Sequence, residues 1–197
     1  NPFLSYNFLH SLEVSKSVHS ETGWHPQHII LYPPEDEENI LAIMPLYLKG
    51  HSQGEYVFDH GWADAYERAG GRYYPKLQSS IPFTPASTPK LLIKKSEANR
   101  AKTLKEALIS SAIQFTKNTG ISSLHLTFIP ETEAQACQDM GLLIRNDQQF
   151  HWLNKGYNNF DDFLNALSSR KRKQIRKERR TAFANDIKIH HLTGPEL

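Results

Sequence analysis

The chain has 197 residues, of which 39% are hydrophobic and 22% charged, and its formal net charge at pH 7 is +2. These shares are those of a globular protein, and the length is sufficient for one domain with a hydrophobic core. No run of about 18 apolar residues occurs, which excludes a membrane-spanning helix. The first residues lack the basic and apolar stretches of a signal peptide, so we expect a cytoplasmic protein.

The single cysteine, Cys137, excludes an internal disulfide and a Cys-x-x-Cys metal pair. It lies among apolar residues at helical spacing, which predicts a buried structural thiol and not a nucleophile. The histidine pairs His25/His28 and His190/His191 have no nearby carboxylate or cysteine cluster. We therefore expect no metal site.

Asn1 can cap a helix whose apolar residues recur at helical spacing from Phe3 to Leu12. Gly23–Pro26 is expected to break the chain after this helix. Two strands, His28–Tyr32 and Ile40–Lys49, follow on either side of an acidic turn, and they predict an antiparallel hairpin. Pro45 within the second strand indicates an edge position or a bulge.

The segment Glu55–Thr88 contains seven aromatic residues, two adjacent glycines and several prolines. Its periodicity is weak, so we expect a long irregular segment with one strand near Lys76–Pro82. Leu91–Ile93 is a further short strand. A loop of this length is usually functional or disordered, and the aromatic residues argue against disorder.

The clearest helix is Lys102–Asn118, which ends at Gly120. Its apolar stripe follows the i, i+3, i+4 spacing of an amphipathic helix and consists of Leu104, Ala107, Leu108, Ser111, Ala112 and Phe115. A strand at Leu124–Phe128 and a short helix at Thr132–Met140 come next.

The C-terminal part predicts a second hairpin from Leu142–Arg145 and Phe150–Asn154, then a helix from Phe160 to Leu167. A basic helix follows, and Ile187–Ile189 is expected to begin a new strand. The order of elements predicts an α/β protein with a mixed sheet and helices on its faces.

Several stretches of the sequence resemble the bacterial FemAB-like family of peptidoglycan biosynthesis/recognition, which is related to the GNAT acyltransferases. The matching stretches are Asn1–Leu4, Ala42–His51, Glu55–Gln78, Pro82–Pro85 and Ser169–Arg180. The resemblance implies an acyl-CoA N-acyltransferase fold, as one domain of a tandem pair. It places a first acyltransferase-like domain at 1–158, a basic helical linker at 159–185 and the start of a second domain at 186–197.

The resemblance also implies an N-acyl or aminoacyl transferase, with acyl-CoA or aminoacyl-tRNA as donor in the full-length protein. A cell-wall precursor or another small molecule would supply the acceptor amine. GNAT enzymes bind the CoA pyrophosphate at a glycine-containing turn that opens a helix. The corresponding segment here, Lys94–Arg100, has no glycine. We therefore expect no cofactor to bind this chain tightly.

The stretch Glu55–Pro85 is the candidate ligand pocket, because aromatic walls and polar contacts alternate in it. Its candidate catalytic residues are His60 and Asp59 for proton handling and Tyr73 and Tyr74 for hydroxyl donation. The candidate substrate-binding residues are Trp62, Asp64, Tyr66, Lys76 and Gln78. The alternative is a long ordered loop whose aromatic residues attach it to the sheet.

Arg170–Arg180 holds eight of the 23 basic residues and one of the 21 acidic residues, so the rest of the chain is mildly acidic. Because this helix lacks the i,i+4 pairs that support a surface helix, it favours an anionic partner such as tRNA, a nucleotide-sugar precursor or a lipid. The partner could instead be an acidic surface of the second domain. The candidate anion-binding residues are Arg170, Arg172, Lys173, Arg176 and Arg179. The alternative is a solvated helix face.

The absence of two catalytic motifs argues against two classes of enzyme. The chain has neither a Gly-x-Ser-x-Gly elbow nor a Gly-x-x-x-x-Gly-Lys phosphate loop, which argues against the corresponding hydrolases and NTPases. Three hypotheses remain: an acyl or aminoacyl transferase, a non-catalytic domain that recognises a peptidoglycan-like or anionic ligand, and nucleic-acid binding through the basic helix.

Overall fold

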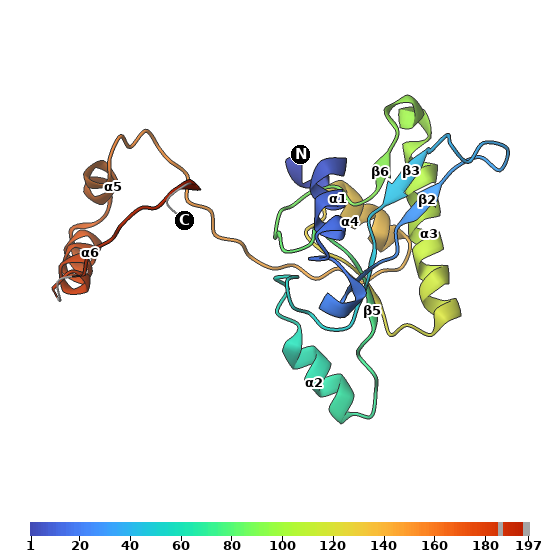
Figure 1. Ribbon diagram of the computed structural model, residues 1–197, viewed down its shortest axis with the longest axis horizontal. Coiled ribbons are helices and arrows are strands. Elements are labelled where there is room, and N and C mark those ends of the chain that lie inside the picture. Colours follow the sequence, from blue (N-terminus) through green and yellow to red (C-terminus); the bar gives the residue numbers. More distant parts are fainter. Residues whose placement is uncertain (185–186, 195–197) are drawn as a thin grey trace. The chain divides into compact units, whose positions relative to one another are not determined.

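The computed structural model describes residues 1–184 and 187–194 of the chain (Figure 1). The chain divides into two compact units, Asn1–Arg145 and Asn146–Leu197. The first unit holds every strand of the described residues, and the second holds two helices.

The first unit begins with short helices. Asn1 caps the 3-10 turn Pro2–Leu4, as predicted, since its side chain accepts a hydrogen bond from the Phe3 N–H at 3.0 Å. Helix α1 spans Tyr6–Val14, and a second 3-10 turn spans Ser20–Thr22.

Four strands form the N-terminal part of the sheets: β1 (Trp24–Pro26), β2 (Ile29–Leu31), β3 (Ala42–Met44) and β4 (Tyr47–Lys49). β1 corrects the prediction of a simple break at residues 23–26. β2 pairs with β3 and β1 with β4, both antiparallel, so the predicted hairpin is confirmed.

The hairpin ladder is interrupted at Pro45. Pro45 and Leu46 lie between β3 and β4, opposite Gln27 and His28, and the Gln27 N–H donates to the Leu46 carbonyl at 2.8 Å. Proline lacks an N–H for the ladder, so an interruption accommodates it. Neither predicted alternative holds: β3 and β4 each have neighbours on both sides, and two residues lie opposite two across the interruption, so the register continues without the extra residue of a bulge.

The strands form a four-stranded sheet in the order β1-β4-β5-β7 and a three-stranded sheet in the order β2-β3-β6. The later strands are β5 (Lys76–Ser79), β6 (Leu92–Ile93) and β7 (Leu124–Leu126). β5 and β7 are parallel and the other described pairs are antiparallel. The predicted mixed sheet is confirmed, as is the mixed α/β class.

Helix α3 (Ala101–Thr119) packs along β2, β3 and β6 (Figure 1). Leu104, Leu108 and Ala112 of its predicted stripe are buried, and Phe115 packs against the same core. The left-handed Gly120, with φ of 65°, ends it as predicted. Helix α4 (Glu131–Asp139) follows β7 and buries Cys137, which confirms the structural thiol. Burial raises the pKa of the Cys137 thiol to about 11.

Helix α2 (His60–Arg68) corrects the expectation that Glu55–Thr88 lacks regular structure before its strand. Ala63 is its one buried residue. A nine-residue helix with one small buried side chain has no apolar stripe, so periodicity could not reveal it.

The second unit contains α5 (Phe160–Ala166) and α6 (Ser169–Ala182), both predicted. The hairpin predicted at 142–154 is absent, and residues 187–189 are not in a strand. Leu143, Phe150, Trp152 and Leu153 are all at least 63% exposed. An alternating apolar pattern forms a stable hairpin only where a sheet or helix covers its apolar face.

Within the described residues, no helix combines the length and apolar character needed to cross a membrane.

Candidate functional site

A buried cluster of charged side chains lies where β4 and β5 meet the loop before α2. The Lys76 ammonium, on β5, donates three hydrogen bonds: to Asp59 Oδ2 at 2.5 Å, to Glu55 Oε2 at 2.8 Å and to Ser52 Oγ at 2.9 Å. Lys76 is 0% exposed, Glu55 2% and Asp59 3%. All three ammonium hydrogens are thus used in hydrogen bonds, two of them to carboxylate oxygens.

Two tyrosines connect this cluster with the surface. The Tyr73 hydroxyl donates to Asp59 Oδ2 at 2.7 Å, and the Tyr74 hydroxyl lies 2.7 Å from Ser52 Oγ. Both rings are only partly buried and meet edge to face, with centroids 5.0 Å apart. The two tyrosines are therefore the least buried residues of the cluster, and their hydroxyl groups contact its buried members.

Lys49 extends the cluster on the neighbouring strand. Its Nζ lies 3.9 Å from Glu55 Oε1 and 3.4 Å from the centroid of the Trp24 ring, and it donates to the Gln53 carbonyl at 3.3 Å. Burial and the positive charge of Lys76 lower the pKa of Lys49 to about 7, although Glu55 acts in the opposite direction. Glu55 therefore lies between two buried lysines.

The two carboxyl groups of the cluster, Asp59 and Glu55, have pKa values shifted in opposite directions. Burial alone would raise the pKa of Asp59, but the hydrogen bonds from Lys76 and Tyr73 outweigh it and lower the pKa to about 2. Burial dominates at Glu55 and raises its pKa. Burial and the Asp59 carboxylate raise the pKa of Tyr73. At neutral pH the Asp59 carboxylate is therefore ionised, and Tyr73 keeps its proton.

Two buried carboxylate oxygens have no hydrogen-bond donor among the described residues: Glu55 Oε1 and Asp59 Oδ1. A buried carboxylate oxygen is costly unless a donor from the protein, water or a ligand satisfies it. The cluster could therefore accept a hydrogen bond from a cationic or amine group.

His125 on β7 lies beside the cluster. Its ring centroid is 6.3 Å from that of Tyr73, and its Nε2 lies 2.8 Å from Ser123 Oγ. Burial first, and then the charge of Lys76, lower the pKa of His125 to about 4. The imidazole is neutral at pH 7.

The structure brings together four of the sequence-predicted site residues: Asp59, Tyr73, Tyr74 and Lys76. Gln78 lies on the same strand but donates to Thr127 Oγ1 at 3.0 Å. Four others lie on α2 and are exposed: His60, Trp62, Asp64 and Tyr66. The Asp59 carboxylate contacts Lys76 and Tyr73, and no hydrogen bond between Asp59 and His60 is described.

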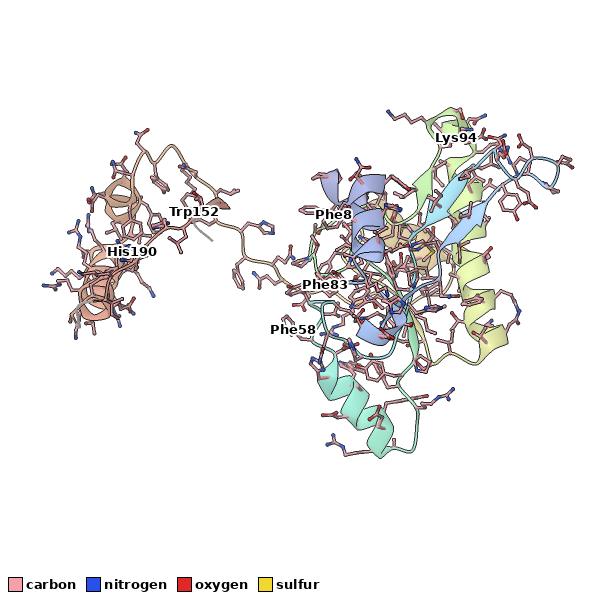
Figure 2. All side chains as sticks on the ribbon, in the orientation of Figure 1. Phe8, Phe58, Phe83, Lys94, Trp152 and His190 are labelled. Carbon is pink, nitrogen blue, oxygen red and sulfur yellow. The ribbon has the colours of Figure 1, made fainter. Side chains whose placement is uncertain are left out.

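Sequence reasoning missed Lys49, Ser52, Glu55 and His125. Lys49 and His125 each belong to a strand whose residues are buried or half-buried on both faces. The alternation of polar and apolar residues along these strands therefore did not indicate which side chains are buried. Glu55 is the first residue of the aromatic segment. Its contact partner Lys76 lies 21 residues further along the chain, so no local pattern indicated the contact. Phe58, labelled in Figure 2 just before α2, is 73% exposed.

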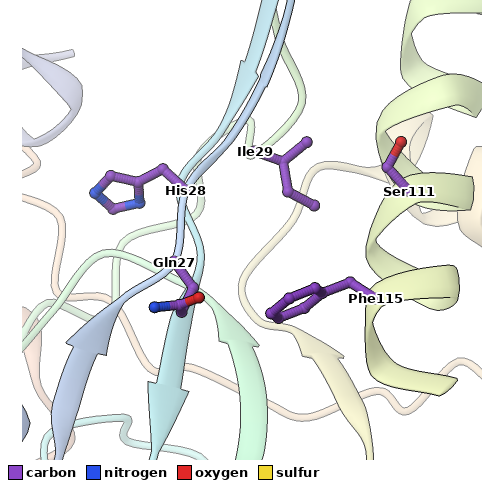
Figure 3. A pocket seen from close by; sticks show the side chains of 5 residues that line it. All are labelled: Gln27, His28, Ile29, Ser111 and Phe115. Atoms are coloured by element: carbon purple, nitrogen blue, oxygen red, sulfur yellow. The ribbon is translucent and has the colours of Figure 1, made fainter. Parts of the chain in front are cut away.

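The pockets described by the structure lie outside Glu55–Pro85. One, of about 290 Å³, is lined by Gln27, His28, Ile29, Ser111 and Phe115. In Figure 3 the Ile29, Ser111 and Phe115 side chains point toward one another, and the His28 ring lies on the other side of its strand. His28 Nδ1 accepts from the Leu46 N–H at 3.1 Å, so its Nε2 carries the proton and donates to Glu13 at 3.0 Å. This pocket is thus beside the ladder interruption.

A second buried lysine site supports the loop between β5 and β6. Lys90, 0% exposed, donates to the Thr88 carbonyl and hydroxyl at 2.8 and 2.9 Å. The Glu133 carboxylate, on α4, accepts from the backbone N–H groups of Lys90 and Leu91 at 2.7 and 3.2 Å. Burial lowers the pKa of Lys90 to about 8.

The segment that the GNAT resemblance predicts to correspond to the CoA pyrophosphate turn, Lys94–Arg100, contains a 3-10 helix, Lys95–Arg100, which continues directly into α3. Lys94 donates from its backbone to the Leu41 carbonyl and from Nζ to Asn39 at 2.6 Å. Its side chain thus contacts the loop between β2 and β3.

The predicted anion-binding residues lie on α6. Arg170, Lys173, Arg176 and Arg179 are exposed, and Arg172 is partly buried with its guanidinium donating to Asn165 at 3.1 Å. Arg176 lies 3.7 Å from Asp161, and Arg179 lies 4.5 Å from the centroid of the Phe160 ring. Ile175 is partly buried, and most of the cations remain exposed.

Comparison with known proteins gives one family. No curated protein and no solved structure matches the chain significantly. The profile of the FemAB-like family, described as peptidoglycan biosynthesis/recognition, matches residues 1–197, the whole chain. The chain therefore belongs to the FemAB-like family of peptidoglycan biosynthesis and recognition.

Proposed function

We propose that this chain is part of an N-acyl or aminoacyl transferase that modifies an amine of a cell-wall precursor, and that the Lys76 cluster receives that amine. The observation that carries the proposal is the Asp59 carboxylate, whose Oδ2 is held by Lys76 and Tyr73 while its buried Oδ1 has no donor among the described residues. An acceptor amine supplies such a donor. Family membership supports the choice of a cell-wall substrate.

In the proposed reaction the acceptor nitrogen forms a bond to the acyl carbonyl carbon, and the carbonyl electrons move to oxygen. The bond to the leaving group then breaks, and the leaving group departs with its electron pair and takes up the proton that the amine loses. The leaving group is the CoA thiol or the ribose hydroxyl of a tRNA. Asp59 would orient the amine, and the Tyr74 hydroxyl would donate to the developing oxyanion, because Ser52 can supply the hydrogen of the Ser52–Tyr74 hydrogen bond whereas the Tyr73 proton is held by Asp59.

We further propose that the first unit has a GNAT-related acyltransferase fold and is one domain of a tandem pair. We also propose that the protein is cytoplasmic. The parallel β5–β7 pair within a mixed sheet is compatible with it.

The test measures acceptor-dependent release of thiol from a panel of acyl-CoA donors, and of tRNA from aminoacyl-tRNA, with precursor peptides as acceptors. Tyr74→Phe should lower the rate about 100-fold, because it removes the oxyanion donor. Tyr66→Phe is the matched control, since Tyr66 is exposed and its hydroxyl is outside the cluster. Equal rates for the two variants would reject the assignment.

A recognition domain without catalysis is the second candidate. Two observations favour it: the charged groups of the cluster are almost completely buried, and Lys94–Arg100 lacks a glycine turn. Binding of a precursor peptide that is lost in Asp59→Asn, with no transfer from any donor, would select this candidate.

A further inference from the structure

We propose that the second unit, Asn146–Leu197, binds the surface of an anionic lipid membrane, with α6 as the electrostatic contact and exposed apolar side chains as the inserting contact. The proposal is independent of the acyl-transfer proposal, because it uses none of the residues of the Lys76 cluster.

The first observation is the charge of α6. Its cations are Arg170, Lys171, Arg172, Lys173, Arg176, Lys177, Arg179 and Arg180, and its one acidic residue is Glu178. Among the described residues, one ion pair involves these cations, between Arg176 and Asp161 at 3.7 Å. Glu178 accepts instead from Gln174 at 2.9 Å. Most of the positive charge is therefore exposed, is not neutralised within the described residues and is available to an external anion.

The second observation is the exposure of large apolar side chains in the same unit. They are Phe150 (89%), Trp152 (63%), Leu153 (72%), Ile187 (56%), Ile189 (62%) and Leu192 (54%). Trp152 is labelled in Figure 2. A water-soluble surface rarely exposes so many large apolar residues unless they bind a partner.

An aromatic pocket connects the two features. Trp152, Tyr157, Phe160 and Phe163 line a hollow of about 390 Å³, and the Arg179 guanidinium lies over the Phe160 ring. Tryptophan and tyrosine prefer the level of lipid headgroups, where an apolar ring and a polar edge are both satisfied. Cations beside such rings would contact the headgroup phosphates.

The aliphatic residues favour a lipid surface over a nucleic acid. Protein surfaces that bind single-stranded nucleic acids combine basic side chains with aromatic rings that stack on the bases. Leu153, Ile187, Ile189 and Leu192 cannot stack, but they lose water-exposed apolar area when they enter the acyl-chain boundary. A cluster of four to eight basic residues adds electrostatic attraction to anionic headgroups.

The experiment measures co-sedimentation of the 197-residue chain with two kinds of vesicle: pure phosphatidylcholine, and phosphatidylcholine with about one-third phosphatidylglycerol. We expect binding to the anionic vesicles alone, and weaker binding as salt is raised. Lys173→Gln/Lys177→Gln/Arg180→Gln removes one exposed stripe of α6 and keeps helix propensity. It should weaken partitioning about 100-fold.

The matched control is Lys95→Gln/Lys102→Gln/Lys117→Gln, which removes the same charge from exposed positions of the first unit. It should retain most of the binding. Phe150→Ser/Leu153→Ser should weaken binding to anionic vesicles at low and at higher salt, because it removes apolar contacts that do not depend on charge. Circular dichroism checks that each variant keeps its helices.

Three results would overturn the proposal. One is the absence of binding to anionic vesicles. Another is an equal loss in the α6 variant and its control. The third is binding to single-stranded RNA that vesicles do not compete for, which would assign α6 to a nucleic acid.

Discussion

Lys49 and Lys76 are directly opposite each other on the antiparallel strands β4 and β5, and both are 0% exposed. Like charges placed opposite each other across a ladder repel, and burial strengthens the repulsion because the local dielectric is low. The loop 50–59 compensates by placing Glu55 against both lysines and Asp59 against Lys76. Because the strand register places the two lysines opposite each other, the folded state is stable only when loop 50–59 brings its carboxylates to them.

The Glu55→Gln variant tests that compensation. It removes the carboxylate that contacts both lysines, so Lys76 keeps only Asp59 as a counter-charge, and Lys49, whose pKa is about 7, loses its one ion-pair partner among the described residues. We expect a loss of about 3–5 kcal/mol in unfolding free energy, measured by urea denaturation at pH 7. Glu67→Gln, on the exposed face of α2, is the control and should change little. Equal stability of the two variants would mean that Glu55 is already neutral.

The pH dependence of stability tests the environment of His125. The folded pKa is about 4, below the usual 6.5. Between these values the unfolded chain binds a proton that the folded chain does not, so unfolding free energy falls as pH drops from about 6.5 to about 4. The fall should be on the order of 2 kcal/mol. His125→Gln should flatten this part of the curve, whereas His60→Gln, at an exposed position, should not.

The helices and strands of the first unit could be predicted where apolar spacing was strong. α3 buries Leu104, Leu108 and Ala112 at helical spacing, so its face was evident. The short helix α2 buries only Ala63, and no pattern distinguishes it from a loop.

The candidate site was predictable only in part, because it depends on contacts between distant residues. Asp59, Tyr73, Tyr74 and Lys76 belong to one polar and aromatic segment, which was noticeable in the sequence. Lys49 is more deeply buried than its neighbour Leu48, which is the reverse of what residue type predicts. Only the pairing of β4 with β5 explains that burial.

Leu108→Asp tests the packing of α3 on the sheet. Leu108 is 0% exposed at the centre of the core, so a carboxylate there would be buried without a partner. We expect a loss of at least about 4 kcal/mol, seen as a lower melting temperature. Leu143→Asp is the control, because Leu143 is 98% exposed. An unchanged melting temperature for Leu108→Asp would contradict the assignment.

Acetyl-CoA should bind this chain weakly. The pyrophosphate of CoA requires free backbone N–H groups at a tight turn, and the corresponding segment is a 3-10 helix without glycine. Calorimetric titration should give a dissociation constant above about 10 μM. A smaller value would show that another part of the chain binds the nucleotide.

Glu133→Gln tests how α4 holds the loop before β6. Both oxygens of the Glu133 carboxylate are used, one by the N–H of Lys90 and the other by that of Leu91, and the side chain is 1% exposed. An amide keeps one acceptor oxygen but places an NH₂ group against the other N–H, so one buried donor loses its partner. The expected cost is about 1–3 kcal/mol in unfolding free energy. Glu131→Gln, on the exposed side of the same helical turn, is the matched control. Hydrogen exchange provides the decisive measurement: the Lys90 and Leu91 amides should lose protection in Glu133→Gln and keep it in Glu131→Gln. Unchanged protection in both variants would show that the loop is held by the Lys90 ammonium and its Thr88 contacts instead.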